Sequence, residues 1–184
     1  KKDNEIEITK HVSQLDLNKI SSYIAEYEKK KQNQKVMDTV RKTFREELIV
    51  TDVAVFTKRE AIQEASNLLI RQGCLTEDVT DKVFDLEEKR PTTIGSQIAM
   101  VHVYKESVKE SGIAILRMKY PTRWSETSKV KLVFFLAINY EESKEILLLF
   151  KSLYSLIDNE EIMEEILEAE GSEKIYEILM KEIG

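Results

Sequence analysis

Two periods of apolar residues alternate along this chain of 184 residues and indicate strands and helices in turn. Four segments rich in β-branched and aromatic side chains predict strands: residues 48–56, 98–104, 112–120 and 130–138. Within the last of them, residues 133–137 are apolar on both faces, as expected for a strand in the middle of a sheet.

Capping signals define two helices between the first and second of these strands. Thr57 and Glu60 have the spacing of a capping box, in which each side chain accepts a hydrogen bond from the other residue's backbone amide. Gly73 supplies a left-handed residue that ends the first helix. Thr76 is expected to cap the second helix, which ends at Pro91 because the residue before a proline avoids helical angles.

Three more helices are expected after the last strand. They cover residues 141–157, 159–169 and 172–183, with Ser172 as the N-cap of the last one. Strands that alternate with helices in this way predict an α/β fold. We therefore expect a mixed β-sheet flanked by helices on both faces.

The first 45 residues have the character of a helical linker or extension, so we divide the chain into residues 1–45 and a domain at 46–184. Apolar residues recur in the extension at helical spacing, but residues 29–34 offer no apolar face. The pattern fits two helices or one long interrupted helix, packed on its own domain. Because the first residue is Lys1 and not methionine, we expect the chain to be a piece of a longer protein.

Charge and composition argue against several classes of function. The net charge of −6 is unfavourable for general nucleic-acid affinity, which needs a basic surface. Residues 28–45 carry seven Lys and Arg but no recognised nucleic-acid motif, so a solvated helical linker is favoured over an RNA or DNA contact. We expect no direct nucleic-acid binding by this chain.

The single cysteine, Cys74, cannot form an intramolecular disulfide, fits a reducing compartment and is expected to be structural. No apolar run approaches the roughly 20 residues that span a bilayer, and no signal-peptide pattern is present. We therefore expect a cytoplasmic protein without membrane insertion. Two distant histidines and one cysteine favour no metal site, and five glycines leave little room for a nucleotide loop, so no metal or cofactor is expected.

His102 is the best candidate for chemistry, because it closes the apolar run that follows Pro91 and Gly95. A neutral imidazole at the end of a strand is nucleophilic near pH 7. Phosphoryl transfer to one ring nitrogen needs a hydrogen bond on the other nitrogen and donors around the phosphoryl oxygens. A half-buried structural histidine is the alternative. The other histidine, His11, is expected to be exposed and inert, and Trp124 is expected to pack against the core.

The order and spacing of several segments resemble one family. These are residues 57–62, residues 68–73, residues 76–78, and the stretch Pro91-Thr92, Gly95, Ile98-Ala99 and His102. From about residue 45 to 184, the chain resembles the enzyme IIA domain of the fructose/mannitol class of the bacterial phosphoenolpyruvate-dependent sugar phosphotransferase system. The resemblance implies that His102 accepts a phosphoryl group from the phosphocarrier protein HPr and passes it to a cysteine of a IIB domain.

The chain departs from the family pattern around this histidine. Val101 stands where the family usually has proline, Val103 where it has glycine or a small residue, and Leu86 where an arginine helps to hold the phosphoryl group. A second family histidine, expected within residues 142–146, is absent. The residues expected around the phosphoryl group are Glu87, which matches a family glutamate, Arg90, Ser96 and Gln97, with Lys89 and Lys105 as further cations.

Two classes of function fit the resemblance. The favoured one is a IIA-type domain at the C-terminus of a PRD-containing transcriptional activator or antiterminator, in which phosphorylation reports sugar availability and the charged extension is an interdomain linker. The alternatives are a stand-alone IIA phosphocarrier of a sugar transporter, and a degenerate IIA-like domain that acts by protein contacts without phosphoryl transfer. A homodimer through the full-length protein is left open.

Overall fold

A five-stranded mixed sheet forms the centre of the molecule. The computed structural model describes residues 14–95, 97–103 and 105–183. The strands are β1 (Ile49–Val53), β2 (Thr93–Ile94), β3 (Ile98–His102), β4 (Gly112–Arg123) and β5 (Lys129–Ala137), in the spatial order β1-β4-β5-β3-β2. β1 runs parallel to β4 and β3 runs parallel to β5, whereas the β4–β5 and β2–β3 pairs are antiparallel.

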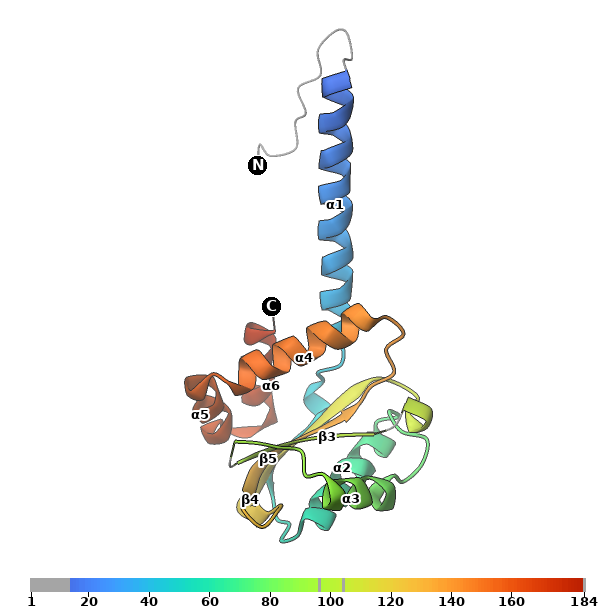
Figure 1. Cartoon of the computed structure of the whole chain (residues 1–184). Helices are drawn as coiled ribbons and strands as arrows, with labels where there is room; N and C mark the ends of the chain where they lie inside the picture. Colours follow the sequence, from blue (N-terminus) through green and yellow to red (C-terminus); the bar gives the residue numbers. More distant parts are fainter. Residues whose placement is uncertain (1–13, 96, 104, 184) are drawn as a thin grey trace.

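Helices cover both faces of the sheet, as predicted (Figure 1). One face carries α2 (Lys58–Arg71) and α3 (Thr80–Lys89), and the other carries α4 (Ser143–Ile157), α5 (Glu160–Glu168) and α6 (Gly171–Glu182). The two short 3-10 helices are η1 (Glu46–Leu48) and η2 (Lys105–Ser107). Each face of the sheet has its own apolar cluster, and the adjacent β5 residues Phe134 and Phe135 point into opposite clusters. The apolar run in β5 is explained by this central position.

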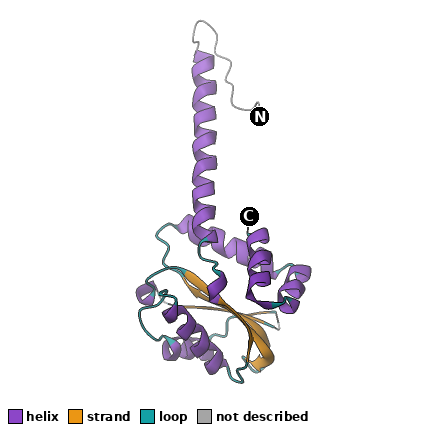
Figure 2. Cartoon of the chain, turned by 180° about the vertical axis from the view of Figure 1, so that it is seen from behind, coloured by secondary structure: helices purple, strands orange, loops and turns teal. Residues whose placement is uncertain are grey.

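The N-terminal segment forms one uninterrupted helix, α1 (Gln14–Arg41), which continues through the polar run that was expected to break it. Its C-terminal part packs against the domain, because Val40 is buried with Phe44 in the cluster beneath α4 and Val36 is buried as well. The N-terminal part projects away from the sheet (Figures 1 and 2), and Leu17, Ile24 and Tyr27 are exposed there. Packing of the extension on its own domain therefore holds only for the last turns of α1.

Local capping signals were partly correct. The Thr57–Glu60 capping box is present at α2, and Gly73 has the positive φ of 73° expected at its end. Thr76 is not an N-cap, because α3 begins at Thr80 and the Thr76 hydroxyl donates to the Ser107 carbonyl. Ser172 is not an N-cap either: α6 begins at Gly171, and the Ser172 hydroxyl donates to Glu46.

The strand directions decide which residues share an end of the sheet. β3 and β5 finish where β4 begins, so His102 lies at the same end as Ala137 and Gly112. The N-terminus of β3 lies at the opposite end, beside the β4–β5 hairpin. Within the described residues, no helix combines the length and hydropathy needed to cross a membrane.

Candidate functional site

His102 is the last residue of β3 and its side chain is exposed. It pairs with Leu136 of the parallel strand β5, and the next amide, of Val103, donates to the Leu136 carbonyl over 3.1 Å. Side chains alternate along a strand, and Met100 packs in the cluster beneath α4 whereas Val101 packs in the cluster beneath α2 and α3. The His102 ring therefore emerges on the α4 side of the sheet.

The imidazole makes no hydrogen bond or ion pair with any residue that the structure describes. The hydrogen bond expected to fix the ring tautomer is therefore not found within this part of the chain. Both ring nitrogens remain available to a docking partner. An exposed, unbonded imidazole at the end of a rigid strand is chemically suited to nucleophilic attack.

Lys105 lies just beyond His102, at the first position of η2. Its ammonium donates a hydrogen bond of 3.1 Å to the backbone carbonyl of Tyr140. Tyr140 is buried, and its hydroxyl is hydrogen-bonded to the side chain of Thr43, which follows α1. Burial raises the pKa of this phenol to about 12. Lys105 is thus attached to the buried cluster on the side of the sheet where His102 emerges.

The start of α4 lies close to the same loop, three residues after Tyr140. Its N-cap residue, Glu142, makes no side-chain capping hydrogen bond, so the first amides of α4 are not satisfied by a cap. Such amides attract anions. Glu141 and Glu142 are exposed at this end and work against that attraction.

The predicted phosphate residues at the start of β3 are not brought to His102. Gln97 lies five residues earlier, which corresponds to roughly 16 Å along an extended strand. Its carbonyl accepts hydrogen bonds from the amides of Lys131, at 2.7 Å, and Leu132, at 3.1 Å, and so fixes the start of β5. Ser96 lies outside the described residues.

Arg90 lies between α3 and the edge strand β2. It forms the C-cap of α3, with an exposed side chain. β2 pairs antiparallel with β3 through Thr93 and Ala99, and the Thr92 carbonyl accepts from the Met100 amide at 2.9 Å. The pairing stops at Thr92, so this register does not place Arg90 beside His102.

Glu87 is buried and has a hydrogen-bonding role of its own. Its carboxylate accepts from the Thr92 amide at 3.0 Å, from the Thr92 hydroxyl at 2.6 Å and from Trp124 Nε1 at 2.9 Å. These bonds join the end of α3 to the approach to β2 and to the end of β4. Trp124 is only 1% exposed, in agreement with its expected packing role.

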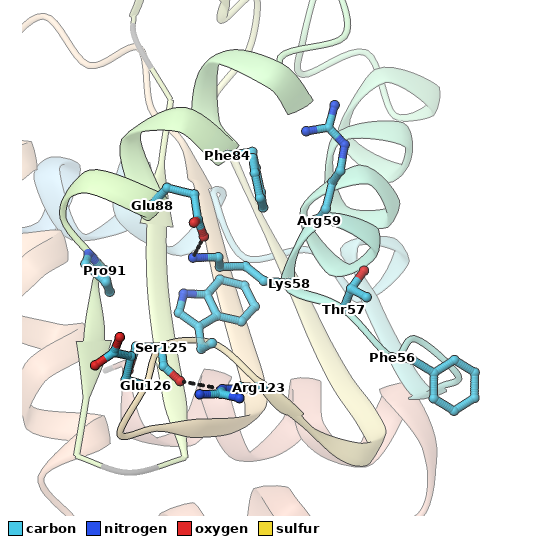
Figure 3. Close-up of a pocket in the computed structure, with 11 residues that line it drawn as sticks. Phe56, Thr57, Lys58, Arg59, Phe84, Glu88, Pro91, Arg123, Ser125 and Glu126 are labelled. Carbon is cyan, nitrogen blue, oxygen red and sulfur yellow. Dashed lines mark hydrogen bonds and ion pairs between the residues drawn. The ribbon is translucent and has the colours of Figure 1, made fainter.

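A cleft of about 890 Å³ adjoins this joint (Figure 3). The Lys58 ammonium lies over the Phe84 ring, 5.5 Å from its centroid, pairs with Glu88 and donates to the Glu87 carbonyl. Arg59 pairs with Asp81 across α2 and α3. These two cations already have carboxylate partners within the protein, so the cleft is explained by the packing of α2, α3 and the β4–β5 hairpin.

Cys74 is fully buried, with its sulfur 2.7 Å from a guanidinium nitrogen of Arg45. Burial raises the pKa of this thiol even though Arg45 acts in the opposite direction. The cysteine therefore stays protonated in the core and is unsuited to nucleophilic chemistry. His11 lies outside the described residues, and the described part of the chain holds no group of three or more residues suited to a metal ion.

The fold agrees with comparisons to known proteins. The family model described as "Phosphoenolpyruvate-dependent sugar phosphotransferase system, EIIA 2" matches residues 42–182, about three quarters of the chain. The chain belongs to this family of IIA domains. The match begins directly after the last residue of α1.

Relatives of two architectures are similar to this chain. The mannitol-specific phosphotransferase enzyme IIA component of Bacillus subtilis is 32% identical over 72% of this chain and 92% of its own length. The transcriptional regulator ManR of Bacillus subtilis is 31% identical over 73% of this chain and 21% of its own length. The "Probable licABCH operon regulator" of the same organism is 24% identical over 89% of this chain. The chain spans about a quarter of the length of these two regulators.

Solved structures show the same architecture. The crystal structure of IIA mannitol from Escherichia coli aligns with a TM-score of 0.63 and 25% identity, over 72% of this chain and 96% of that one. IIA mannitol in its complex with phosphorylated IIB mannitol, also from Escherichia coli, aligns with a TM-score of 0.65 and 24% identity, over 75% of this chain and 99% of that one. The predicted fold class is confirmed.

The hydrogen bond between Lys105 and Tyr140 was not foreseen from the sequence. Lys105 was one of several basic residues near His102, and nothing in the local pattern distinguished it. The two residues are connected through the sheet: Leu136 pairs with His102 in the parallel β3–β5 ladder, and Tyr140 lies four residues beyond Leu136. The sequence alone does not give this register.

Proposed function

We propose that this domain accepts a phosphoryl group on His102 from the phosphocarrier protein HPr. The observation that carries the proposal is the exposed His102 ring at the end of β3, in a chain that belongs to the EIIA 2 family. The lone pair of an unprotonated ring nitrogen attacks phosphorus, and the bond between phosphorus and the donor breaks, with its electron pair leaving on the donor. The other ring nitrogen keeps its proton.

The candidate residues around the phosphoryl group differ in their relation to His102. The Arg90 side chain is exposed, whereas Glu87 is engaged in its own hydrogen bonds and Gln97 is about a strand length away from His102. We keep Arg90 as a candidate partner and give Glu87 the role of fixing the segment that leads into β2. Ser96 stays a prediction from the sequence.

A labelling experiment tests the acceptor. The chain is incubated with phosphoenolpyruvate, enzyme I and HPr, beside the mannitol IIA component of Bacillus subtilis as a positive control. We expect an acid-labile phosphate on the chain, loss of that phosphate in His102→Ala, and its retention in His11→Ala. A wild-type chain that stays unlabelled while the control is labelled would overturn the proposal and favour a degenerate domain that acts by protein contacts.

We further propose that the domain serves a sugar-responsive transcriptional regulator of the PRD-containing activator or antiterminator class, in the cytoplasm. Its similarity to ManR and to the licABCH regulator supports this assignment. The projecting α1 supports it as well, since a rigid charged helix is suited to link residues 46–184 to a preceding domain. The full-length reading frame tests it, because regulatory modules upstream are required.

The second candidate is a stand-alone IIA phosphocarrier. It is favoured by the match to nearly the whole length of the mannitol IIA component. In either case a IIB domain is the proposed recipient of the phosphoryl group, in line with the IIA–IIB complex of the Escherichia coli relative. Transfer from the labelled chain to a purified IIB domain distinguishes a carrier from a purely regulatory acceptor. A homodimer would form through the rest of a full-length regulator.

A further inference from the structure

A phosphoryl group on His102 needs a nearby cation, and no cation is bonded to the His102 ring within the described residues. Its three oxygens carry the negative charge and require donors. The His102 ring has no hydrogen bond or ion pair within the described residues, and Leu86 offers no charge on α3. We propose that Lys105 is the residue that binds the phosphoryl group, and that Tyr140 and Thr43 are positioning residues that hold Lys105 in place. This inference rests on the proposed phosphorylation of His102.

The side of the sheet on which His102 emerges supports Lys105. The alternation of β3 directs His102 toward the face that contains Met100 and Tyr140, and Lys105 is bonded to the Tyr140 carbonyl on that face. Lys105 follows His102 by only three residues, so its four-carbon side chain is long enough to serve both positions. One of the three ammonium donors is used on Tyr140, and two remain for phosphoryl oxygens.

The hydrogen bond to the Tyr140 carbonyl holds the Lys105 ammonium in a fixed position before a phosphoryl group binds. The Tyr140 carbonyl belongs to a buried residue whose hydroxyl is bonded to Thr43, and the Thr43 carbonyl accepts from the Ile113 amide at 3.2 Å. A lysine that is already fixed loses less side-chain freedom when it binds an anion than a free lysine does. The end of α1 therefore contributes to the site through Thr43 and Tyr140.

Other charged groups near this end of the sheet are less well placed. Lys144 lines the groove between α4 and α1, away from the sheet edge. Arg90 is exposed and has no hydrogen-bond partner for its side chain in the described chain, so it must order its side chain on binding. Glu106, Glu141 and Glu142 oppose a phosphoryl group, which increases the need for a fixed cation.

The test compares lysine variants in the labelling reaction. Lys105→Met is expected to lower the initial rate of phosphorylation about tenfold, the effect of losing one charge-assisted hydrogen bond in the transition state. Lys105→Arg should restore most of the rate. Lys129→Met, which removes an exposed lysine at the opposite end of the sheet, is the matched control and should label like wild type. Thr43→Val should fall between Lys105→Met and wild type.

Two further measurements distinguish the loss of the Lys105 charge from a loss of folded structure. Thermal unfolding midpoints of the two Lys105 variants should agree with wild type within a few degrees, since Lys105 is exposed. In phosphorus NMR of the labelled chain, the pKa for conversion of the phosphoryl monoanion to the dianion should be higher in Lys105→Met than in wild type, because a nearby cation favours the dianion.

The outcomes distinguish this inference from the proposed function. A wild-type chain without label rejects phosphorylation itself. A labelled wild type with a Lys105→Met variant of equal rate and equal phosphoryl titration rejects Lys105 as the binding residue. A Lys105→Arg variant as slow as Lys105→Met also rejects it, and a Thr43→Val variant with the wild-type rate rejects the positioning role.

Discussion

Arg117 shows at the scale of one residue how the β4 strand holds the C-terminal helices. Its guanidinium is buried and donates to the carbonyls of Ile166, Leu167 and Ala169, which end α5. The last carbonyls of a helix have no partner within the helix, so a buried cation there satisfies several of them at once. Arg117 therefore fixes α5 to the sheet.

Replacing Arg117 by Met should lower the free energy of unfolding by about 3 kcal/mol, because buried carbonyls lose a charged donor. The measurement is urea denaturation. Arg123→Met is the matched control: Arg123 is exposed, the only hydrogen bond of its side chain in the described chain goes to the nearby Ser125 carbonyl, and its loss should cost less than about 0.5 kcal/mol. Equal losses in the two variants would contradict this assignment.

Asp78 gives the fold a pH-dependent contribution. Hydrogen bonds from the Thr80 hydroxyl and amide lower the pKa of this carboxyl from 3.8 to about 2, with smaller help from Gln63 and Ser66. Since the pKa is lower in the folded chain, the carboxylate stabilises the fold above about pH 4, and this stabilisation is lost as the pH falls toward 2. Asp78 is exposed, so solvent screening reduces the contribution to about 1 kcal/mol.

The comparison of wild type with Asp78→Asn isolates this carboxylate. At pH 7 the variant should be less stable by about 1 kcal/mol, and the difference should shrink toward zero near pH 2, as measured by urea denaturation across this range. Asp85→Asn, in the helix α3 that follows Asp78 and without a side-chain hydrogen bond or ion pair in the described chain, is the control. A difference for Asp78→Asn that stays constant with pH would reject the mechanism.

Capping hydrogen bonds were predictable from the sequence where the two residues that form them are close in the chain. The Thr57 capping box lies within four residues, so its spacing was sufficient to predict it. Thr76 and Ser172 had the same local appearance, but tertiary partners, Ser107 and Glu46, took their hydroxyl groups. A capping signal has no information about such distant acceptors, which explains both errors.

Contacts between residues far apart in the chain also determine the candidate site, and the sequence does not reveal them. The position of His102 at the end of a strand was predictable from the apolar run that it closes. Glu87 was chosen because it matches a family glutamate, and Arg90, Ser96 and Gln97 because they are near in sequence. The strand direction places Gln97 at the far end of β3, and Trp124, 37 residues after Glu87, takes one of its carboxylate oxygens. Only the strand order reveals such relations.

At the scale of elements, long apolar patterns were reliable and short ones were not. β5 has nine residues with an apolar centre and was predicted within one residue at either end. β2 has only two residues, too few to show a period, and was missed. The polar run in α1 was read as an interruption because it has no apolar face. It stays helical because helix formation does not require one when neighbouring turns continue on both sides.

The two parts of α1 should differ in local stability. The N-terminal part leaves Ile24 48% exposed and Tyr27 59% exposed, whereas Val36 and Val40 are buried against the domain. A helix without tertiary contacts is marginal in water. Amides of residues 20–30 should therefore exchange with deuterium at least about tenfold faster than those of residues 36–43. Uniform protection along α1 would mean that another surface covers its N-terminal part.

At the scale of the whole molecule, the alternation of strands and helices was enough to predict the class of fold, since each amphipathic element must bury one face. It could not predict which strands are neighbours. That order is set by the parallel crossovers from β1 to β4 and from β3 to β5, which join segments far apart in the chain. It also decides that α1 ends beneath α4, next to Tyr140 and therefore close to His102.

The proposed division at residue 45 can be tested by two deletions. Removing residues 1–28 takes away the projecting part of α1 and should change the free energy of unfolding by less than about 0.5 kcal/mol, with labelling of His102 unchanged. Removing residues 1–41 also removes the buried Val36, Val40 from the cluster beneath α4, and the bond from Arg41 to the Met180 carbonyl. Burial of two valines is worth about 3 kcal/mol or more, so this deletion should be clearly destabilised in urea. If the longer deletion is as stable as wild type, α1 is an extension throughout and the domain is independent of it; if it is destabilised, the last turns of α1 belong to the fold that presents His102.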